Sequence, residues 1–120
     1  MAVFEQGDVI KVPFPYTDRA ARQYRPALVV SSHGFGAAHG LLWVLMITSA
    51  ANRGWPGDIS IANLSTAGLP APSVIRTAKI ATIETADAVK LGRISATALK
   101  KTLDAVATRS RGRDITSHSS

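Results

Sequence analysis

An arginine stands immediately before the proline that opens the apolar part of QYRPALVVSS, residues 23–32. Ala27 to Val30 are apolar and partly β-branched, which predicts a buried strand, and Pro26 is tolerated at the first position of such a strand or on a sheet edge. We therefore expect Arg25 at the mouth of a strand, where scaffold meets loop. Its guanidinium stays charged at neutral pH and presents a planar fork of donors that matches phosphate oxygens. An ordinary exposed strand-end arginine is the alternative.

Other residues able to bind a polyanion lie near the ends of predicted strands. Thr48 and Ser49 end the most apolar strand, and their hydroxyls either serve a site or hydrogen-bond a turn. The loop after the first strand is basic, and its tyrosines offer stacking surfaces of the kind that single-strand binders use. The candidates there are Tyr16, Arg19, Arg22 and Tyr24. A solvated basic loop is the alternative.

Two histidines, His33 and His39, lie in a glycine-rich connection. Two imidazoles are the simplest metal-free acid and base pair near neutral pH, but nothing in the sequence brings these two together. Two histidines without a nearby carboxylate or thiolate do not fill a zinc shell, and the chain has no cysteine. We therefore expect neither a metal site nor a cofactor.

Composition sets the bounds for the whole chain. Its 120 residues are enough for one domain, and 46% hydrophobic with 18% charged residues is ordinary globular composition. The absence of cysteine excludes disulfides and is compatible with a reducing cytosol. The longest apolar run, at 40–47, is too short to cross a bilayer, so we expect a cytoplasmic protein without membrane contact. A net charge of +6 favours a polyanionic partner.

Alternation of apolar and polar residues predicts mostly strands. They are expected at 7–15, 26–31, 41–49, a short stretch within 58–64, and 73–84. In the last of these the alternation breaks, which requires either a bulge or burial on both faces. Closely spaced strands before a terminal helix predict a mainly β fold, a small antiparallel β-barrel.

One amphipathic helix is expected over about 96–108, because apolar residues recur there at helical spacing. Ser95 is the expected N-cap. The run 109–120 is polar and rich in serine, and we expect it to be a basic, disordered tail. The chain is thus divided into a single domain, 1–108, and this tail.

Several short strings share an order and spacing with a known family. They are GDVIKVPFPYTD and RPALVVSS within 7–32, ITSA at 47–50, LPAPSVIRTAKIATIE at 69–84, and KLGRIS at 90–95. Together they resemble the MazF/PemK family of type II toxin-antitoxin endoribonucleases, from about Gly7 to Val106. The resemblance implies an SH3-like barrel with an appended helix and a homodimer. It also implies metal-independent, sequence-selective cleavage of single-stranded RNA, as an mRNA interferase held in check by a cognate antitoxin.

RNA cleavage without a metal requires removal of the 2′-hydroxyl proton, donation of a proton to the leaving oxygen and stabilisation of a phosphorane. The resemblance implies that Arg25 is the principal catalytic residue and Thr48 its hydroxyl partner, with Ser49 a weaker candidate. Because arginine is a poor base, we expect Arg25 to act as an electrostatic stabiliser and proton donor, which leaves the general base unassigned. The resemblance also places Arg76 and Lys79 on the strand that flanks the RNA groove. Cross-strand pairing with carboxylates is their alternative role.

The first loop departs from the family pattern. It reads TDRAARQY at 17–24, with arginine and alanine where the family has small hydroxyl and acidic residues. Two other functions stay open: a non-catalytic CcdB-like toxin that inhibits DNA gyrase, and a degenerate family member that binds RNA without cutting it. The pair of Arg25 and Thr48 favours the nuclease. Trp43 is expected in the core or a dimer interface, and Trp55 as a stacking residue or an antitoxin contact.

Overall fold

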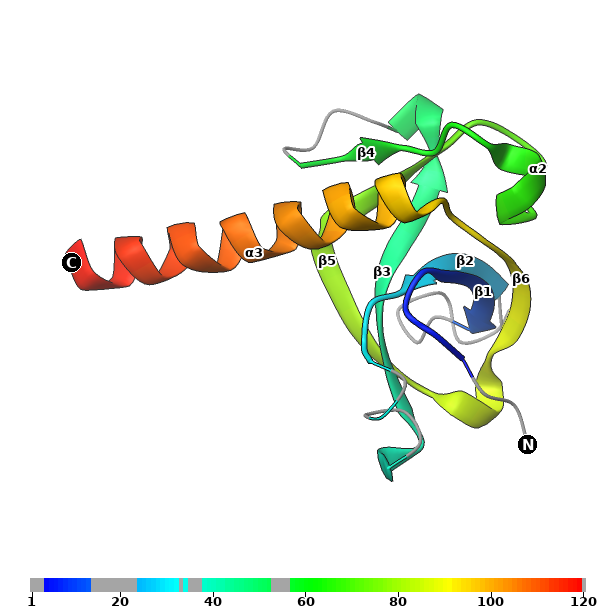
Figure 1. Ribbon diagram of the computed structural model, residues 1–120, viewed down its shortest axis with the longest axis horizontal. Helices are drawn as coiled ribbons and strands as arrows, with labels where there is room; N and C mark the ends of the chain where they lie inside the picture. Colours follow the sequence, from blue (N-terminus) through cyan, green and yellow to red (C-terminus); the bar gives the residue numbers. More distant parts are fainter. Residues whose placement is uncertain (1–3, 14–23, 33, 35–37, 53–56, 120) are drawn as a thin grey trace.

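The computed structural model describes residues 4–13, 24–32, 34, 38–52 and 57–119, with side chains except at 52, 78, 79 and 108–119. The strands are β1 (Asp8–Pro13), β2 (Tyr24–Val29), β3 (Leu41–Ser49), β4 (Ile59–Ser60), β5 (Ser73–Glu84) and β6 (Val89–Arg93). The helical elements are η1 (Ala50–Asn52), α2 (Leu64–Ala67), η2 (Thr85–Asp87) and α3 (Ala96–Ser119). Figure 1 shows the strands curled around the body and α3 running out from it.

The strands form one antiparallel sheet in the order β4-β5-β3-β2-β1-β6. The predicted mainly β fold with antiparallel strands and a C-terminal helix is confirmed. Among the described residues β4 and β6 remain the sheet edges, so hydrogen bonds do not close the barrel. Instead α2, which follows β4, packs on β6 and spans the gap.

The two longest strands match the predicted ranges 41–49 and 73–84 at both ends. Their ladder shifts register between Leu45, which pairs with Ile80, and Met46, which pairs with Arg76. This shift is the bulge that the sequence analysis gave as one of two explanations for the broken alternation. The strand expected at 26–31 is shifted and runs from Tyr24 to Val29, so Arg25 lies within it. The sequence reasoning missed β6 and α2, which are short and lack clear periodicity.

Each face of the sheet carries an apolar cluster. The first cluster contains Phe4, Ile10, Val12, Ala27, Val29, Leu42, Val44, Ile83 and Ala88, with Met46 packed against it. The second contains Val9, Leu28, Leu45, Ile47, Ile61, Ala67, Leu69, Ile75 and Ile94. Leu99 and Val106 of α3 pack against this second cluster, which therefore lies between the sheet and the helices. Burial of both faces explains the broken alternation in β5.

Helix α3 begins where the sequence predicts. The Oγ atom of Ser95 accepts a hydrogen bond from the Ala98 amide at 3.1 Å, which confirms the N-cap. The helical backbone continues to Ser119, so the predicted end near residue 108 was wrong. The run 109–119 contains no proline, and its residues tolerate helix once an upstream turn is formed. A division of the chain at residue 108 stays a prediction.

The contact between α2 and β6 is unusually close. Gly68 ends α2 with a φ of 74°, and a Cβ placed there would lie 2.2 Å from the Leu91 carbonyl oxygen. A Cβ on Gly92 would lie 2.3 Å from the Thr66 carbonyl oxygen. Glycine is needed at both positions because the two backbones meet directly.

The substitution Gly68→Ala is expected to lower the free energy of unfolding by about 3 kcal/mol or more, since it adds a backbone clash to the cost of a positive φ. Gly40 is the matched control, because it has a φ of 68° and a Cβ added to it would meet nothing within 4 Å. Gly40→Ala should cost only about 1–2 kcal/mol. Urea unfolding of both variants measures the difference, and equal losses would show that α2 does not need to approach β6 so closely.

Candidate functional site

Neighbouring strands bring Arg25 and Thr48 to one end of one sheet face. The ladder between β2 and β3 ends at the pair of Ala27 and Met46. Continued by two residues, the same register sets Arg25 opposite Thr48. Paired positions of an antiparallel ladder point to the same face, and every second residue returns to it. The two candidates therefore share the face of the first apolar cluster.

The surroundings of this pair are apolar. Arg25 pairs with Val12 on β1, and Thr48 pairs with Val74 on β5. Both valines are fully buried, whereas Arg25 is exposed and Thr48 partly exposed. On the continued register the guanidinium and the hydroxyl would be neighbours on this face, each flanked on its outer side by a buried valine. Together they can donate hydrogen bonds to the oxygens of one phosphodiester.

Arg76 lies on the same face, opposite Met46. Its Nε donates to Oδ1 of Asp58 at 3.3 Å and its Nη2 to Oδ2 at 3.1 Å. The two side chains are only 9% and 8% exposed. The predicted groove residue is thus half of a buried ion pair, and a direct RNA contact by Arg76 stays a prediction that this geometry does not favour.

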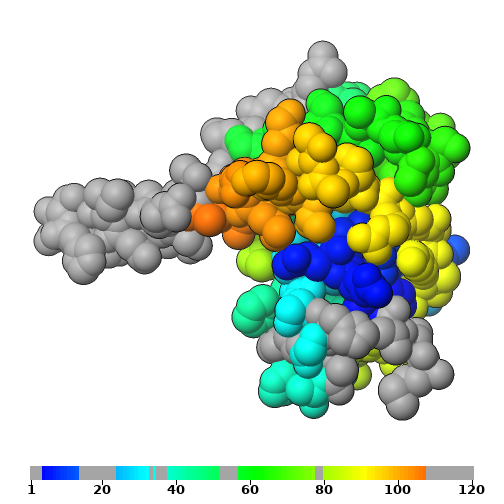
Figure 2. Space-filling model, viewed as in Figure 1, coloured from blue at the N-terminus to red at the C-terminus, as the bar shows by residue number. Residues whose placement is uncertain are grey.

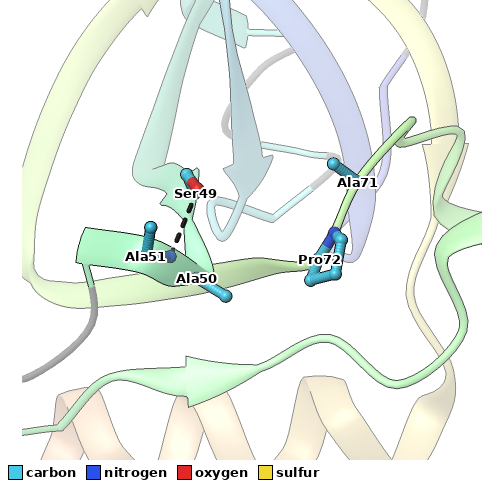
Figure 3. Close-up of a pocket in the computed structure, with 5 residues that line it drawn as sticks. All are labelled: Ser49, Ala50, Ala51, Ala71 and Pro72. Carbon is cyan, nitrogen blue, oxygen red and sulfur yellow. Dashed lines mark hydrogen bonds between the residues drawn. The ribbon is translucent and has the colours of Figure 1, made fainter.

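Ser49 points away from Thr48, as adjacent strand residues must. It pairs with Ser73, and its Oγ accepts a hydrogen bond from the Ala51 amide at 3.2 Å (Figure 3). Ser49 lines an open pocket of about 530 Å³ together with Ala50, Ala51, Ala71 and Pro72. These described lining residues carry no charge, so the pocket offers no cation to a phosphate.

Tyr24 also lies on the face opposite Arg25. It pairs with Pro13, and its side chain is 53% exposed. The Lys11 ammonium lies 6.0 Å from the centroid of its ring, at the outer limit of a cation–π contact. An exposed ring with a neighbouring cation suits the stacking of a base near a phosphate.

Several predicted residues cannot be placed. Tyr16, Arg19, Arg22, His33 and Trp55 lie outside the described residues. Lys79 lies in β5 at the register shift, but its side chain is not among those described.

Trp43 is 45% exposed on β3, so its expected place in the core was wrong and the interface reading stays open. Within the described part of the chain, no three histidine, aspartate or glutamate side chains are arranged to hold a metal ion. None of the helices described is long and apolar enough to span a membrane.

Asp58, the ion-pair partner of Arg76, is a residue that the sequence reasoning missed. It lies 18 positions before Arg76, a separation that matches no local motif. Only the pairing of β4 with β5, which sets Ile59 opposite Ile75, brings this turn beside Arg76. A lone acidic residue after a proline-glycine turn was the sole signal available.

A family model and solved structures point to the same family of toxins. A family model described as "PemK-like, MazF-like toxin of type II toxin-antitoxin system" matches residues 5–109. A search of curated proteins finds no match.

Solved structures share the fold at low sequence identity. MazF from Deinococcus radiodurans is 21% identical with a TM-score of 0.72, over 90% of this chain and 96% of that one. The MazE-MazF complex of that organism is 20% identical with a TM-score of 0.71, over 90% of this chain and 95% of that one. An endoribonuclease from a mycobacterial species, in complex with its cognate antitoxin, is 18% identical with a TM-score of 0.69. The match covers 90% of this chain and 93% of that one.

Breaking the buried ion pair is expected to destabilise the protein strongly. Arg76→Met leaves the Asp58 carboxylate buried without its cation, which should lower the free energy of unfolding by about 3–5 kcal/mol. Lys100 and Asp104 on α3 form the matched exposed pair, at 3.3 Å with side chains 78% and 69% exposed. Lys100→Met should cost less than about 1 kcal/mol. Chemical denaturation of both variants tests this, and a small loss in Arg76→Met would contradict it.

Proposed function

We propose that this chain, which belongs to the PemK-like, MazF-like family of type II toxins, is an endoribonuclease. It would cut single-stranded RNA without a metal ion or cofactor. The observation that carries the proposal is the β2–β3 register at Ala27 and Met46, which, continued by two residues, would put Arg25 across from Thr48 on one sheet face. The endoribonuclease named among the solved structures of the same fold adds support. The expected role is that of an mRNA interferase acting in the cytoplasm.

In the proposed reaction the 2′-oxygen of a ribose attacks the adjacent phosphorus, and the bond from phosphorus to the 5′-oxygen breaks. The products are a 2′,3′-cyclic phosphate and a free 5′-hydroxyl. Arg25 donates hydrogen bonds to the non-bridging oxygens, whose negative charge increases in the phosphorane. Thr48 donates its hydroxyl hydrogen to the same phosphate or orients Arg25. The proton lost by the 2′-hydroxyl goes to a general base that we leave unassigned, and Arg25 is the proposed donor of the proton that the leaving 5′-oxygen gains.

Further basic and aromatic residues are proposed to hold the rest of the RNA, and of these Tyr24 lies on the sheet face opposite Arg25. Tyr24, exposed beside Lys11, is suited to stack on a base. The loop candidates Tyr16, Arg19 and Arg22 stand between β1 and β2 in the sequence and remain part of the proposal. Lys79 completes the proposed set, and the net charge of +6 supports a polyanionic substrate.

Two protein partners belong to the proposal. A cognate antitoxin is supported by the family and by solved complexes of the same fold, and an acidic antitoxin would complement the basic chain. A second copy of the chain is supported by two apolar side chains on neighbouring strands, Trp43 at 45% and Ile80 at 55% exposure. Burial of such side chains against another molecule removes apolar surface from water.

Cleavage of a long single-stranded RNA in EDTA is the direct test, with sequencing of the fragment ends. The wild-type protein should give discrete cuts with 5′-hydroxyl ends. Arg25→Ala should lower the cutting rate about 100-fold or more, because it removes the charge that stabilises the phosphorane. Lys101→Ala, which removes an exposed cation on α3, should cut normally. RNA left intact by the wild type would refute the nuclease, and bound but uncut RNA would indicate a degenerate member.

Thr48 and Ser49 provide a second test, because adjacent residues of a strand point to opposite faces of the sheet. Thr48→Val should lower kcat about 10-fold or more, because the hydroxyl is lost with little change in volume. Ser49→Ala should leave kcat within about threefold, since its hydroxyl bonds the Ala51 amide on the other face. Single-turnover cleavage of one fluorescent oligonucleotide compares them, and the reverse order of effects would disprove the assigned face.

A further inference from the structure

The buried pair of Asp58 and Arg76 is part of a larger attachment. Thr77, the next residue on β5, donates its Oγ1 hydrogen to the Gly57 carbonyl oxygen at 2.8 Å. Two consecutive residues of β5 are thus bonded to two consecutive residues of the turn before β4. Thr77 is 5% exposed and Arg76 is buried beside it, whereas Gly57 lies at the exposed end of the attachment. We call these four residues the β5 clamp.

The β5 clamp lies at the register shift of the main ladder. Regular pairing of β5 with β3 stops at Ile80 and resumes at Arg76, which pairs with Met46. A bulge bends its strand and weakens local pairing. The bidentate ion pair and the Thr77 hydrogen bond fix β5 at the point where the ladder resumes.

The position of Thr48 depends on the part of the β3–β5 ladder that resumes at Arg76. The ladder between β2 and β3 ends at Met46, and beyond it the ladder of β3 is with β5, through Val74 opposite Thr48. Thr48 is two residues from Met46, or about 7 Å along the strand. A displacement of β5 at Arg76 is therefore transmitted to Thr48, while Arg25 is held by β1.

We propose that Asp58 and Arg76 are positioning residues, which hold Thr48 at its working distance from Arg25 without touching the RNA themselves. The inference rests on the proposed function for its kinetic consequence. A phosphodiester must contact both groups at once, and a misplacement of about 1 Å between them can cost up to about 100-fold in rate. The ion pair is buried and bidentate, so its two hydrogen bonds fix the orientation of Arg76 as well as attracting it to Asp58.

The experiment replaces the pair by apolar residues, Asp58→Leu with Arg76→Met, because replacing both partners of a buried ion pair often preserves stability while removing the directional bonds. The matched control is Lys100→Met with Asp104→Leu, the same change in the exposed pair on α3. We expect kcat to fall about 10-fold or more with KM changed less than about threefold. Charge reversal, Asp58→Arg with Arg76→Asp, should recover part of the lost kcat.

Methyl NMR of the protein without RNA tests the positioning of Thr48 independently of cleavage. The Met46 and Thr48 methyl signals should shift in the apolar double variant and stay in place in the α3 control. If the wild type cuts no RNA, the proposed function fails, and the methyl shifts still decide the positioning.

Unchanged methyl signals would overturn the inference, as would an unchanged kcat. A raised KM with normal kcat would overturn it too, because it would show that Arg76 binds RNA directly. Should the double variant not fold, Asp58→Asn, which keeps the volume and removes the charge, is judged by the same criteria.

Discussion

The register of the ladder between β3 and β5 is the constraint on which the candidate site depends. It extends from Leu41 opposite Glu84 to Ser49 opposite Ser73, with one shift after Leu45. The shift lets one long strand supply apolar side chains to both clusters. It also lets a cation lie in the interior of the face, since Arg76 enters the ladder just where regular pairing resumes. Every residue from Met46 to Ser49 takes its orientation from this point.

Buried carboxylates organise a basic chain. Asp8 is 1% exposed and accepts a hydrogen bond from Arg93 Nη1 at 2.8 Å, which ties β1 to β6. Asp58 ties the turn before β4 to β5 in the same way. A buried charge is tolerated only when it is paired, so each acidic residue fixes one arginine and one strand. The two edges of the sheet are thus anchored by ion pairs, and its centre by apolar packing. Figure 2 shows the described part of α3 lying against the segment that carries β4 and α2, above this framework.

How much the sequence could predict follows from the range of each interaction. The ends of β3 and β5 were predicted because both strands are long and their turn residues are local. The N-cap at Ser95 was predicted for the same reason. By contrast, α2 and β6 depend on a contact between Gly68 and Leu91, far apart in sequence. Asp58 was missed because its partner is set by strand pairing alone. The association of Arg25 with Thr48 came from family resemblance, and the strand register shows that the two residues share a sheet face.

Side-chain alternation makes the candidate site sensitive to a single position. Thr48 and Ser49 carry the same functional group, yet Thr48 lies on the sheet face that carries Arg25 and Ser49 lines an uncharged pocket. A slip of one residue in β3 would exchange them and would also move Met46 out of the first cluster. Because Met46 pairs with Ala27 on one side and Arg76 on the other, such a slip would expose apolar surface and bury a charge against the wrong neighbour. The packing that stabilises the sheet therefore also selects which hydroxyl lies on the sheet face of Arg25.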